Sequence, residues 1–205
     1  MNVEDWLIDR IVGSEIRVVA ICGAADLGKS YLARQLVAKL RERMIPAVCL
    51  GLDSYLIPRD VRAKQGLSGY DPGSHDLDSA KRDVERLLSG QSIEYFEYRH
   101  DAGHRSEHAI LLEPASHIFI EGLHSMHPSL ASLVDFSIYI FTSEVELRRI
   151  RREADLKKRK LTNIEANEHE ASELESYYRY VHPYKTACNV SIYLDQHWHY
   201  HLMQE

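Results

Sequence analysis

The chain has 205 residues, of which 44% are hydrophobic and 27% charged, and its 31 acidic and 25 basic residues give a formal net charge of −6. This length suits one buried core and no internal repeat divides it, so residues 1–205 are expected to form a single domain. The negative charge disfavours a nucleic-acid partner, and without a signal peptide or a run of ~20 apolar residues the protein is expected in the cytoplasm, with no membrane attachment.

The first predicted unit is a strand, a loop and a helix. Residues 16–22 form a β-branched apolar run that is typical of a buried strand. After the loop, apolar residues recur at helical spacing from Leu32 to Met44, and Pro46 ends the pattern. We expect the apolar stripe of this helix to pack on a sheet.

The loop between them, residues 23–30, reads GAADLGKS and fits the pattern G-x-x-x-x-G-K-[ST] between a strand and a helix, as the pattern requires. Such a loop turns backbone N–H groups toward phosphates, while Lys29 would contact the terminal phosphates and Ser30 would ligate Mg²⁺. Because Asp26 adds a carboxylate to an anion-binding loop, its side chain is expected to point to solvent. We therefore predict ATP and Mg²⁺ as cofactors, with the ATP-binding residues Gly23, Ala24, Ala25, Asp26, Leu27, Gly28, Lys29 and Ser30.

Two further apolar runs each end in an acid. Residues 47–52 lead to Asp53, and residues 118–120 lead to Glu121. The strand of Asp53 is expected to lie beside the strand of the phosphate-binding loop, so that this carboxylate reaches a hydroxyl near the γ-phosphate and acts as the catalytic base. Glu121 would hold Mg²⁺ with Ser30, directly or through water. The alternatives are an Asx turn at Asp53 and a solvent-facing acid at Glu121.

Residues of about 54–115 interrupt the alternation of strands and helices. They contain a turn-rich stretch, a helical pattern over 77–88 and two short extended pieces at 93–98 and 109–112. We interpret them as an inserted region that faces the substrate. With further strands at 136–141 and 190–194, the pattern predicts an α/β, three-layer fold of the P-loop NTPase type with a five-stranded, mainly parallel sheet.

A basic stretch follows the strand at 136–141. Ser143 and Glu146 form a capping-box pair that starts a helix, and this helix leads into Arg148, Arg149, Arg151, Arg152, Lys157, Lys158, Arg159 and Lys160. The stretch predicts a helical lid over about 148–165 that closes over phosphates and excludes water. The alternative is a solvated helix face. A second helical pattern runs from about 164 to 180 and must end before Pro183.

Several motifs recur in the order seen in a known family. From about residue 16 to residue 194 the chain resembles the uridine kinase and phosphoribulokinase family of P-loop kinases. The motifs that support the resemblance are the phosphate-binding loop, Asp53-Ser54-Tyr55, Tyr70-Asp71-Pro72, Glu121-Gly122 and the arginine-rich lid.

This resemblance implies MgATP as phosphoryl donor, Asp53 as base, and Ser30 and Glu121 near the metal. It also implies that Lys29 acts on the phosphates together with Arg149, Arg152 and Arg159. In nucleoside kinases of the family, the position of Asp71 binds sugar hydroxyls, and those of Tyr98 and His104 line the base pocket. The implied substrate-binding set is Tyr55, Tyr70, Asp71, Tyr98, His104 and Arg105.

The expected function is an ATP-dependent kinase that phosphorylates a hydroxyl of a small metabolite, with a nucleoside as the first candidate acceptor. The residues Arg99, His100, His104 and Arg105 replace the typical uridine-kinase pattern, so a sugar phosphate or a carboxylate-bearing alcohol is the alternative. A nucleotide-binding regulatory protein without turnover is the rival from another class. A homo-oligomer stays open, and the alternating histidines 197, 199 and 201 lack an evident fourth ligand for a metal.

Overall fold

A six-stranded sheet forms the centre of the protein, with strand order β10-β9-β8-β1-β7-β2. The computed structural model describes residues 2–157 and 159–203, so Lys158 of the basic stretch lies outside the described residues. The strands are β1 (Val18–Gly23), β2 (Ala47–Gly51), β7 (His117–Glu121), β8 (Phe136–Phe141), β9 (Val190–Leu194) and β10 (Tyr200–Leu202). The predicted five parallel strands are confirmed, and β10 adds a sixth that pairs antiparallel with β9.

One expectation about strand order is wrong. The strand that leads to Asp53 does not neighbour β1, because β7 pairs with β1 on one side and with β2 on the other. The burial of the strands explains this order. Four of the five residues of β7 are buried, which suits an interior strand, whereas β2 lies at the edge of the sheet with Cys49 and Gly51 partly exposed.

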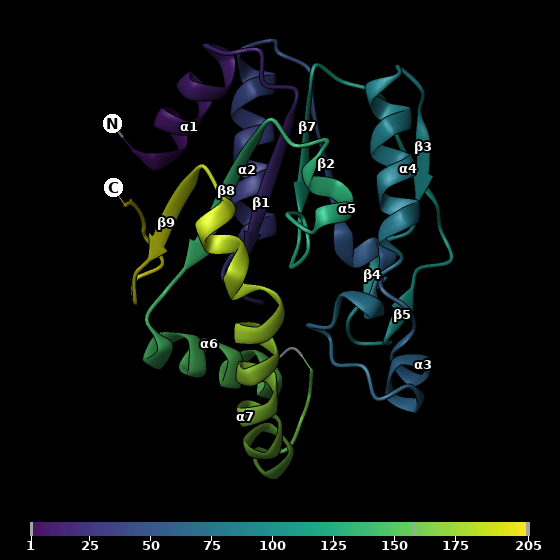
Figure 1. Ribbon diagram of the computed structural model, residues 1–205, viewed down its shortest axis with the longest axis vertical. Helices are drawn as coiled ribbons and strands as arrows, with labels where there is room; N and C mark the ends of the chain where they lie inside the picture. The colour runs from purple at the N-terminus through teal and green to yellow at the C-terminus, as the bar shows by residue number, and fades with distance from the viewer. Residues whose placement is uncertain (1, 158, 204–205) are drawn as a thin grey trace.

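Helices cover both faces of the sheet (Figure 1). On one face, α1 (Val3–Val12) and α2 (Lys29–Glu42) pack against side chains such as Val19 and Ile21. On the other face, α4 (Leu77–Leu88) and α5 (Pro128–Ala131) pack against side chains such as Val18 and Leu50. Because successive residues of β1 point to opposite faces, one apolar strand supplies both cores. The predicted three-layer α/β fold is confirmed.

The inserted region lies beyond the end of β2. It contains two 3-10 turns, η1 (Leu52–Tyr55) and η2 (Pro72–Ser74), and the short helix α3 (Arg59–Lys64), which the sequence analysis did not predict. Two small hairpins follow, one made of β3 (Ile93–Tyr95) with β6 (Ile110–Leu112) and one made of β4 (Tyr98–Arg99) with β5 (His104–Arg105).

The stretch predicted to form a lid, residues 148–165, spans most of α6 (Glu144–Lys157) and the start of α7 (Asn163–Tyr180), and the 3-10 turn η3 (His182–Ala187) follows α7. We refer to α6 and α7 as the lid helices. Thr162 and Glu165 form a capping box that starts α7. In Figure 1 the lid helices lie at the same end of the sheet as α3. No helix within residues 2–157 and 159–203 is both long and apolar enough to cross a membrane.

The histidine-rich tail forms the turn and the strand β10 of a hairpin with β9. The sequence analysis predicted β9 but not β10. Asp195, at the turn, contacts His201 at 2.8 Å and accepts from the backbone N–H groups of His197 and His199. The hydroxyl of Tyr200 on β10 donates to the backbone carbonyl of Gly28 at 3.1 Å. The end of the described chain is thereby attached to the loop of residues 23–30.

We predict that Tyr200→Phe lowers the free energy of unfolding by about 0.5–1.5 kcal/mol, because the Gly28 carbonyl loses a hydrogen-bond donor. Denaturant unfolding measures this loss. The matched control is Tyr193→Phe on the adjacent strand, whose ring packs on Phe141 with 5.6 Å between ring centroids, and which should change stability by less than about 0.5 kcal/mol. Equal losses in the two variants would contradict the role given to the Tyr200 hydroxyl.

Candidate active site

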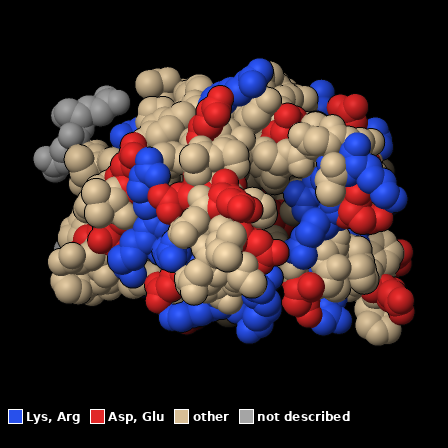
Figure 2. Space-filling view, turned by 90° about the horizontal axis from the view of Figure 1, so that it is seen from below, with Lys and Arg blue, Asp and Glu red and all other residues tan. Residues whose placement is uncertain are grey.

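A cleft of about 690 Å³ opens at the carboxyl ends of β1, β2 and β7, where ligands of open α/β sheets bind. Residues 23–30 and Glu121 lie on the sheet side, α3 and the residues around it form one wall, and the lid forms the other. Figure 2 views this end of the molecule, and basic and acidic side chains alternate over the face that it shows. The cleft brings together the two strand-end acids and the phosphate-binding loop.

The phosphate-binding loop depends on glycine for its path. Gly23 has φ +138°, and a side chain there would place Cβ 2.1 Å from the carbonyl oxygen of Ile140 on the neighbouring strand. Gly28 has φ +79° and comes directly before the first turn of α2. Only glycine fits both the φ angle and the close approach of the backbone at Gly23.

Lys29 is buried at the start of α2, and its Nζ donates to the carbonyl of Ala24 at 2.7 Å. Desolvation lowers the pKa of Lys29, while the negative charges of Glu121 and Asp53 act against that shift. The ammonium group therefore lies inside the loop, close to both strand-end acids. A bound phosphate would bring a negative charge close to the buried ammonium group and stabilise its charged form.

Asp53 reaches the cleft from the edge strand because η1 follows β2 directly. Its Oδ2 lies 2.9 Å from Nε2 of His100, a residue of the inserted region. Desolvation raises the pKa of Asp53, but the hydrogen bond and charge of His100, together with the charges of His75 and Lys29, outweigh it and leave the pKa below its ordinary value. Asp53 is thus an ionised carboxylate held in one orientation by an imidazole.

Glu121 and Ser30 fit the metal site that the sequence predicts. Burial raises the pKa of Glu121, as does the charge of Asp53, and the charge of Lys29 and a hydrogen bond from Ser30 oppose this rise. A cation beside this buried carboxylate would stabilise its charged form. Mg²⁺ takes one or two protein carboxylates and completes its coordination sphere with phosphates and water, so Glu121 with the Ser30 hydroxyl is a donor set that this ion can use.

The lid faces the loop through Arg159, which the family resemblance implied, and through Arg151, which it did not. Arg151 is buried, and its Nη1 lies 2.5 Å from Oδ2 of Asp26, while Nη2 of Arg159 lies 2.9 Å from the same oxygen. Glu173 of α7 also pairs with Arg151. The expectation that Asp26 points to solvent is therefore wrong: its side chain is 11% exposed and joins the phosphate-binding loop to the lid.

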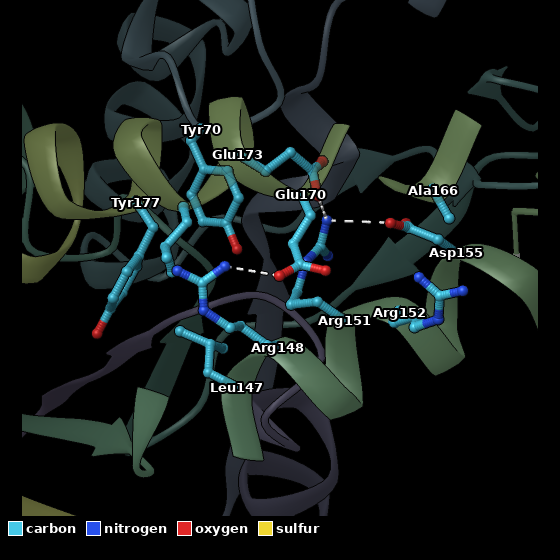
Figure 3. Close-up of a pocket in the computed structure, with 11 residues that line it drawn as sticks. Tyr70, Leu147, Arg148, Arg151, Arg152, Asp155, Ala166, Glu170, Glu173 and Tyr177 are labelled. Carbon is cyan, nitrogen blue, oxygen red and sulfur yellow. Dashed lines mark hydrogen bonds and ion pairs between the residues drawn. The ribbon is translucent and has the colours of Figure 1, made fainter. Parts of the chain in front are cut away.

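Arg149 and Arg152 do not line the cleft. Arg149 pairs at the surface with Glu146 and Glu153, and Arg152 donates to Asn163 and Asn167 of α7. Figure 3 shows the narrow pocket between α6 and α7, in which Arg148 pairs with Glu170 and Arg151 with Glu173 and Asp155. Of the three lid arginines named from the resemblance, the structure brings only Arg159 to the phosphate-binding loop.

The helical period explains why Arg151 faces inward. Leu147 and Ile150 are the buried apolar residues of α6, and Arg151 and Asp155 are its other buried residues, four and eight positions after Leu147. Residues four apart share one face of a helix. This spacing was available in the sequence and would have selected Arg151 in place of its neighbours.

Most of the predicted substrate residues have other partners. Tyr55 donates to Asp83, Tyr98 donates to the carbonyl of Gly103, and the Asp71 carboxylate accepts from the N–H of Gly73. His104 bonds the carbonyl of Arg105, and the Arg105 guanidinium lies 6.0 Å from the ring centroid of Tyr55. None of these residues lines the cleft.

Tyr70 is the one member of the predicted substrate set that lines the cleft. Its hydroxyl accepts a hydrogen bond from the N–H of Ala25 at 3.2 Å, and the Arg151 guanidinium lies 5.7 Å from its ring centroid. Its ring also meets Tyr177 of α7 edge to face at 6.1 Å. Tyr70 therefore connects the inserted region to both the phosphate-binding loop and the lid.

Two arginines and two histidines of the inserted region line the cleft instead: Arg59, Arg62, His75 and His100. Arg62 donates to the carbonyl of Ile57 and to the hydroxyl of Tyr98, and Arg59 donates to the carbonyl of His100. The sequence analysis named only His100 among them. Arg59 and Arg62 lie on a short helix that the sequence did not predict, and His75 follows the recognised Tyr70-Asp71-Pro72 motif but is not part of it.

Comparison with known proteins supports one family. The family model described as Phosphoribulokinase / Uridine kinase family matches residues 18–197. A phosphoribulokinase from Synechocystis sp. is 30% identical over 138 residues, which are 67% of this chain but only 40% of that protein, so the chain spans less than half of the length of this relative. A uridine kinase from Leuconostoc citreum is 28% identical over 190 residues, covering 88% of this chain and 89% of that protein.

Solved structures share the fold at lower identity. The D-glycerate 3-kinase from Cryptococcus neoformans superposes with a TM-score of 0.67 at 12% identity, over 98% of this chain and 96% of that one. The fold is therefore common to proteins whose sequences have diverged widely.

We predict that Asp26→Asn loosens the lid in the protein without nucleotide. Arg151 and Arg159 lose a charged acceptor, and a hydrogen bond to a charged group contributes about 1.5–3 kcal/mol, so amide hydrogen exchange of α6 and α7 should become about ten- to a hundredfold faster. The matched control is Glu153→Gln on α6, because both partners of Glu153, Arg149 and Lys157, are exposed. Its loss should change exchange little. Unchanged exchange in Asp26→Asn would contradict this role of Asp26.

A second prediction concerns the pKa of Asp53. In His100→Ala the largest influences that lower this pKa are lost and desolvation remains, so the pKa of Asp53 should rise. Carboxyl ¹³C NMR across a pH titration measures it. His104→Ala is the matched control, because this exposed histidine bonds only the neighbouring Arg105 carbonyl among the described residues. A pKa that falls or stays the same in His100→Ala would refute the assignment.

Proposed function

The chain belongs to the phosphoribulokinase and uridine kinase family, and on that premise we propose that it is an ATP-dependent kinase that moves the γ-phosphate of MgATP to a hydroxyl of a small metabolite. The observation that supports this most is the joint presence of Asp53, Lys29 and Glu121 around one cleft. A nucleotide switch or a binding protein needs the phosphate-binding loop, but it does not need an ionised carboxylate placed on the acceptor side of that loop.

In the proposed mechanism each residue has a separate task. The N–H groups of the loop and Lys29 hold the phosphates, and Ser30 and Glu121 would hold Mg²⁺, which neutralises developing charge on the phosphates when bound. Asp53 accepts the proton of the acceptor hydroxyl, whose oxygen forms a bond to the γ-phosphorus as the bond from that phosphorus to ADP breaks. Lys29 and the arginines nearest to the loop, Arg151 and Arg159, stabilise the transferred group.

The lid and the inserted region would bind different substrates. In this proposal the lid over residues 148–165 covers the nucleotide phosphates, and the region of residues 54–115 forms the acceptor side within one domain. Tyr70 supports the division, because it contacts both parts and the phosphate-binding loop. Closing the lid would exclude water, which competes with the acceptor for the γ-phosphate.

The charge of the acceptor side favours an anionic acceptor over an uncharged nucleoside. Arg59 and Arg62 donate to backbone carbonyls and to the Tyr98 hydroxyl, and within the described part of the chain neither forms an ion pair. The residues that the resemblance assigns to a nucleoside, Asp71, Tyr98 and His104, point to other partners. We therefore propose a sugar phosphate or a carboxylate-bearing alcohol such as glycerate, with a nucleoside as the second candidate.

An acceptor panel tests the proposal. Purified protein with MgATP should release ADP faster when D-glycerate or D-ribulose 5-phosphate is added, and uridine should stimulate less. Asp53→Asn should lower kcat by about a hundredfold or more, because the base is lost, while the Kd of MgATP stays within about twofold. ADP release and calorimetric titration supply the two measurements.

The matched control is Asp71→Asn, which changes an aspartate of the same region whose carboxylate bonds the N–H of Gly73. It should retain most of the turnover. If ADP release never responds to an acceptor while MgATP still binds, the protein is a nucleotide-binding regulator. If Asp53→Asn keeps full turnover, Asp53 has no part in the mechanism.

A further inference from the structure

His75 lines the cleft but has no task in the proposed mechanism. It directly follows η2, its backbone pairs with Leu56, and its side chain is 6% exposed. The charges of Asp53 and Arg62 both act on its imidazole. His75 is therefore a buried histidine in the same cleft as the carboxylate that would take the acceptor proton and an arginine of the acceptor side.

The hydrogen bonds around Ser74 determine which nitrogen of His75 carries the proton. The Ser74 hydroxyl donates its one proton to the carbonyl of Asp71 at 2.7 Å, so toward Nδ1 of His75, 3.4 Å away, it can only accept. Nδ1 must then be the protonated nitrogen of the neutral ring, and a hydrogen bond of His75 to the Asp71 backbone agrees with this tautomer. Nε2 is left with a free lone pair.

This lone pair has no hydrogen-bond partner among the described residues. Burial lowers the pKa of His75 to about 4, so the ring is neutral near pH 7 and Nε2 is an acceptor, not a donor. A buried acceptor without a donor is costly, and native proteins rarely keep one without a use for it.

The neighbouring His124 shows the ordinary arrangement for a buried histidine. It lies 5.0 Å from His75, ring centroid to ring centroid, and is fully buried. Its Nε2 bonds the carbonyl of Tyr70 at 3.0 Å and its Nδ1 bonds the hydroxyl of Tyr184 at 3.2 Å. Both of its nitrogens have partners, so the open acceptor is specific to His75.

We propose that Nε2 of His75 accepts a hydrogen bond from a second hydroxyl of the acceptor, one that lies between the reacting hydroxyl at Asp53 and the anionic group at Arg62. The inference rests on the proposed function, since it assumes that an acceptor binds in this cleft. It narrows the acceptor to a polyhydroxylated anion, and it makes His75 a specificity-determining residue.

The direct test is ¹⁵N NMR of protein labelled at histidine. Addition of D-ribulose 5-phosphate in the presence of MgADP should move the Nε2 resonance of His75 upfield, as expected when that nitrogen accepts a hydrogen bond, and His75→Phe identifies the resonance by its loss. The resonances of His124 serve as the internal control and should stay in place. Inorganic phosphate, which brings the anion without a polyol, should leave Nε2 of His75 unchanged.

Kinetics supply an independent readout. His75→Phe keeps a ring of similar size but removes the acceptor, so KM for D-ribulose 5-phosphate should rise about tenfold, the value of one lost hydrogen bond, with kcat and the KM of MgATP little changed. His75→Gln, whose amide oxygen can accept, should recover part of the loss. If circular dichroism shows that His75→Phe unfolds, His75→Gln identifies the resonance instead, and the NMR result then decides alone.

The outcomes separate this inference from the proposed function. If D-ribulose 5-phosphate, D-glycerate and ribitol all leave the His75 resonance unchanged, or if inorganic phosphate moves it equally, the assignment of His75 is overturned, even where turnover is normal. If the resonance moves with a polyol but no acceptor stimulates ADP release, the kinase proposal fails and the hydroxyl-binding role of His75 stands.

Discussion

The site depends on one constraint: the charged groups buried at the carboxyl end of the sheet need opposite charges nearby. Lys29 is buried against the loop carbonyl of Ala24, and Glu121 is buried beside Ser30. Each of these groups would be costly alone in such surroundings. They tolerate burial because opposite charges lie close by, and the same closeness prepares the cleft for a polyphosphate and a cation.

The arginines on the two walls of the cleft have different partners. On the lid side, Arg151 and Arg159 pair with carboxylates, so this wall is balanced before any ligand arrives. On the acceptor side, Arg59 and Arg62 donate to neutral oxygens and form no ion pair within residues 2–157 and 159–203. An incoming anionic acceptor is therefore attracted more strongly to the acceptor-side wall than to the lid side.

The sequence predicted those parts that depend on local pattern. Apolar runs gave the five parallel strands, and the loop of residues 23–30 was recognisable because its glycines and Lys29 have to occur at fixed spacing. The order of the strands was not predictable in this way, since it depends on which strand needs burial on both sides. The acceptor side was not predictable either, because Arg62 on α3 and His75 after η2 reach the cleft through tertiary contacts, and the nearby Tyr70-Asp71-Pro72 motif does not include them.

Without a ligand, the Asp26 carboxylate serves as the counterion of Arg151 and Arg159 in the lid. When a polyphosphate reaches the loop, Arg151 and Arg159 would exchange one anion for another, and most of the dehydration of their guanidinium groups has already taken place during folding. The carboxylate is covalently part of the loop, so its effective concentration far exceeds that of chloride or sulfate in solution. Solutes with a single negative charge would therefore compete poorly with the Asp26 carboxylate. A ligand with several negative charges, such as a polyphosphate, would compete for the guanidinium groups of Arg151 and Arg159.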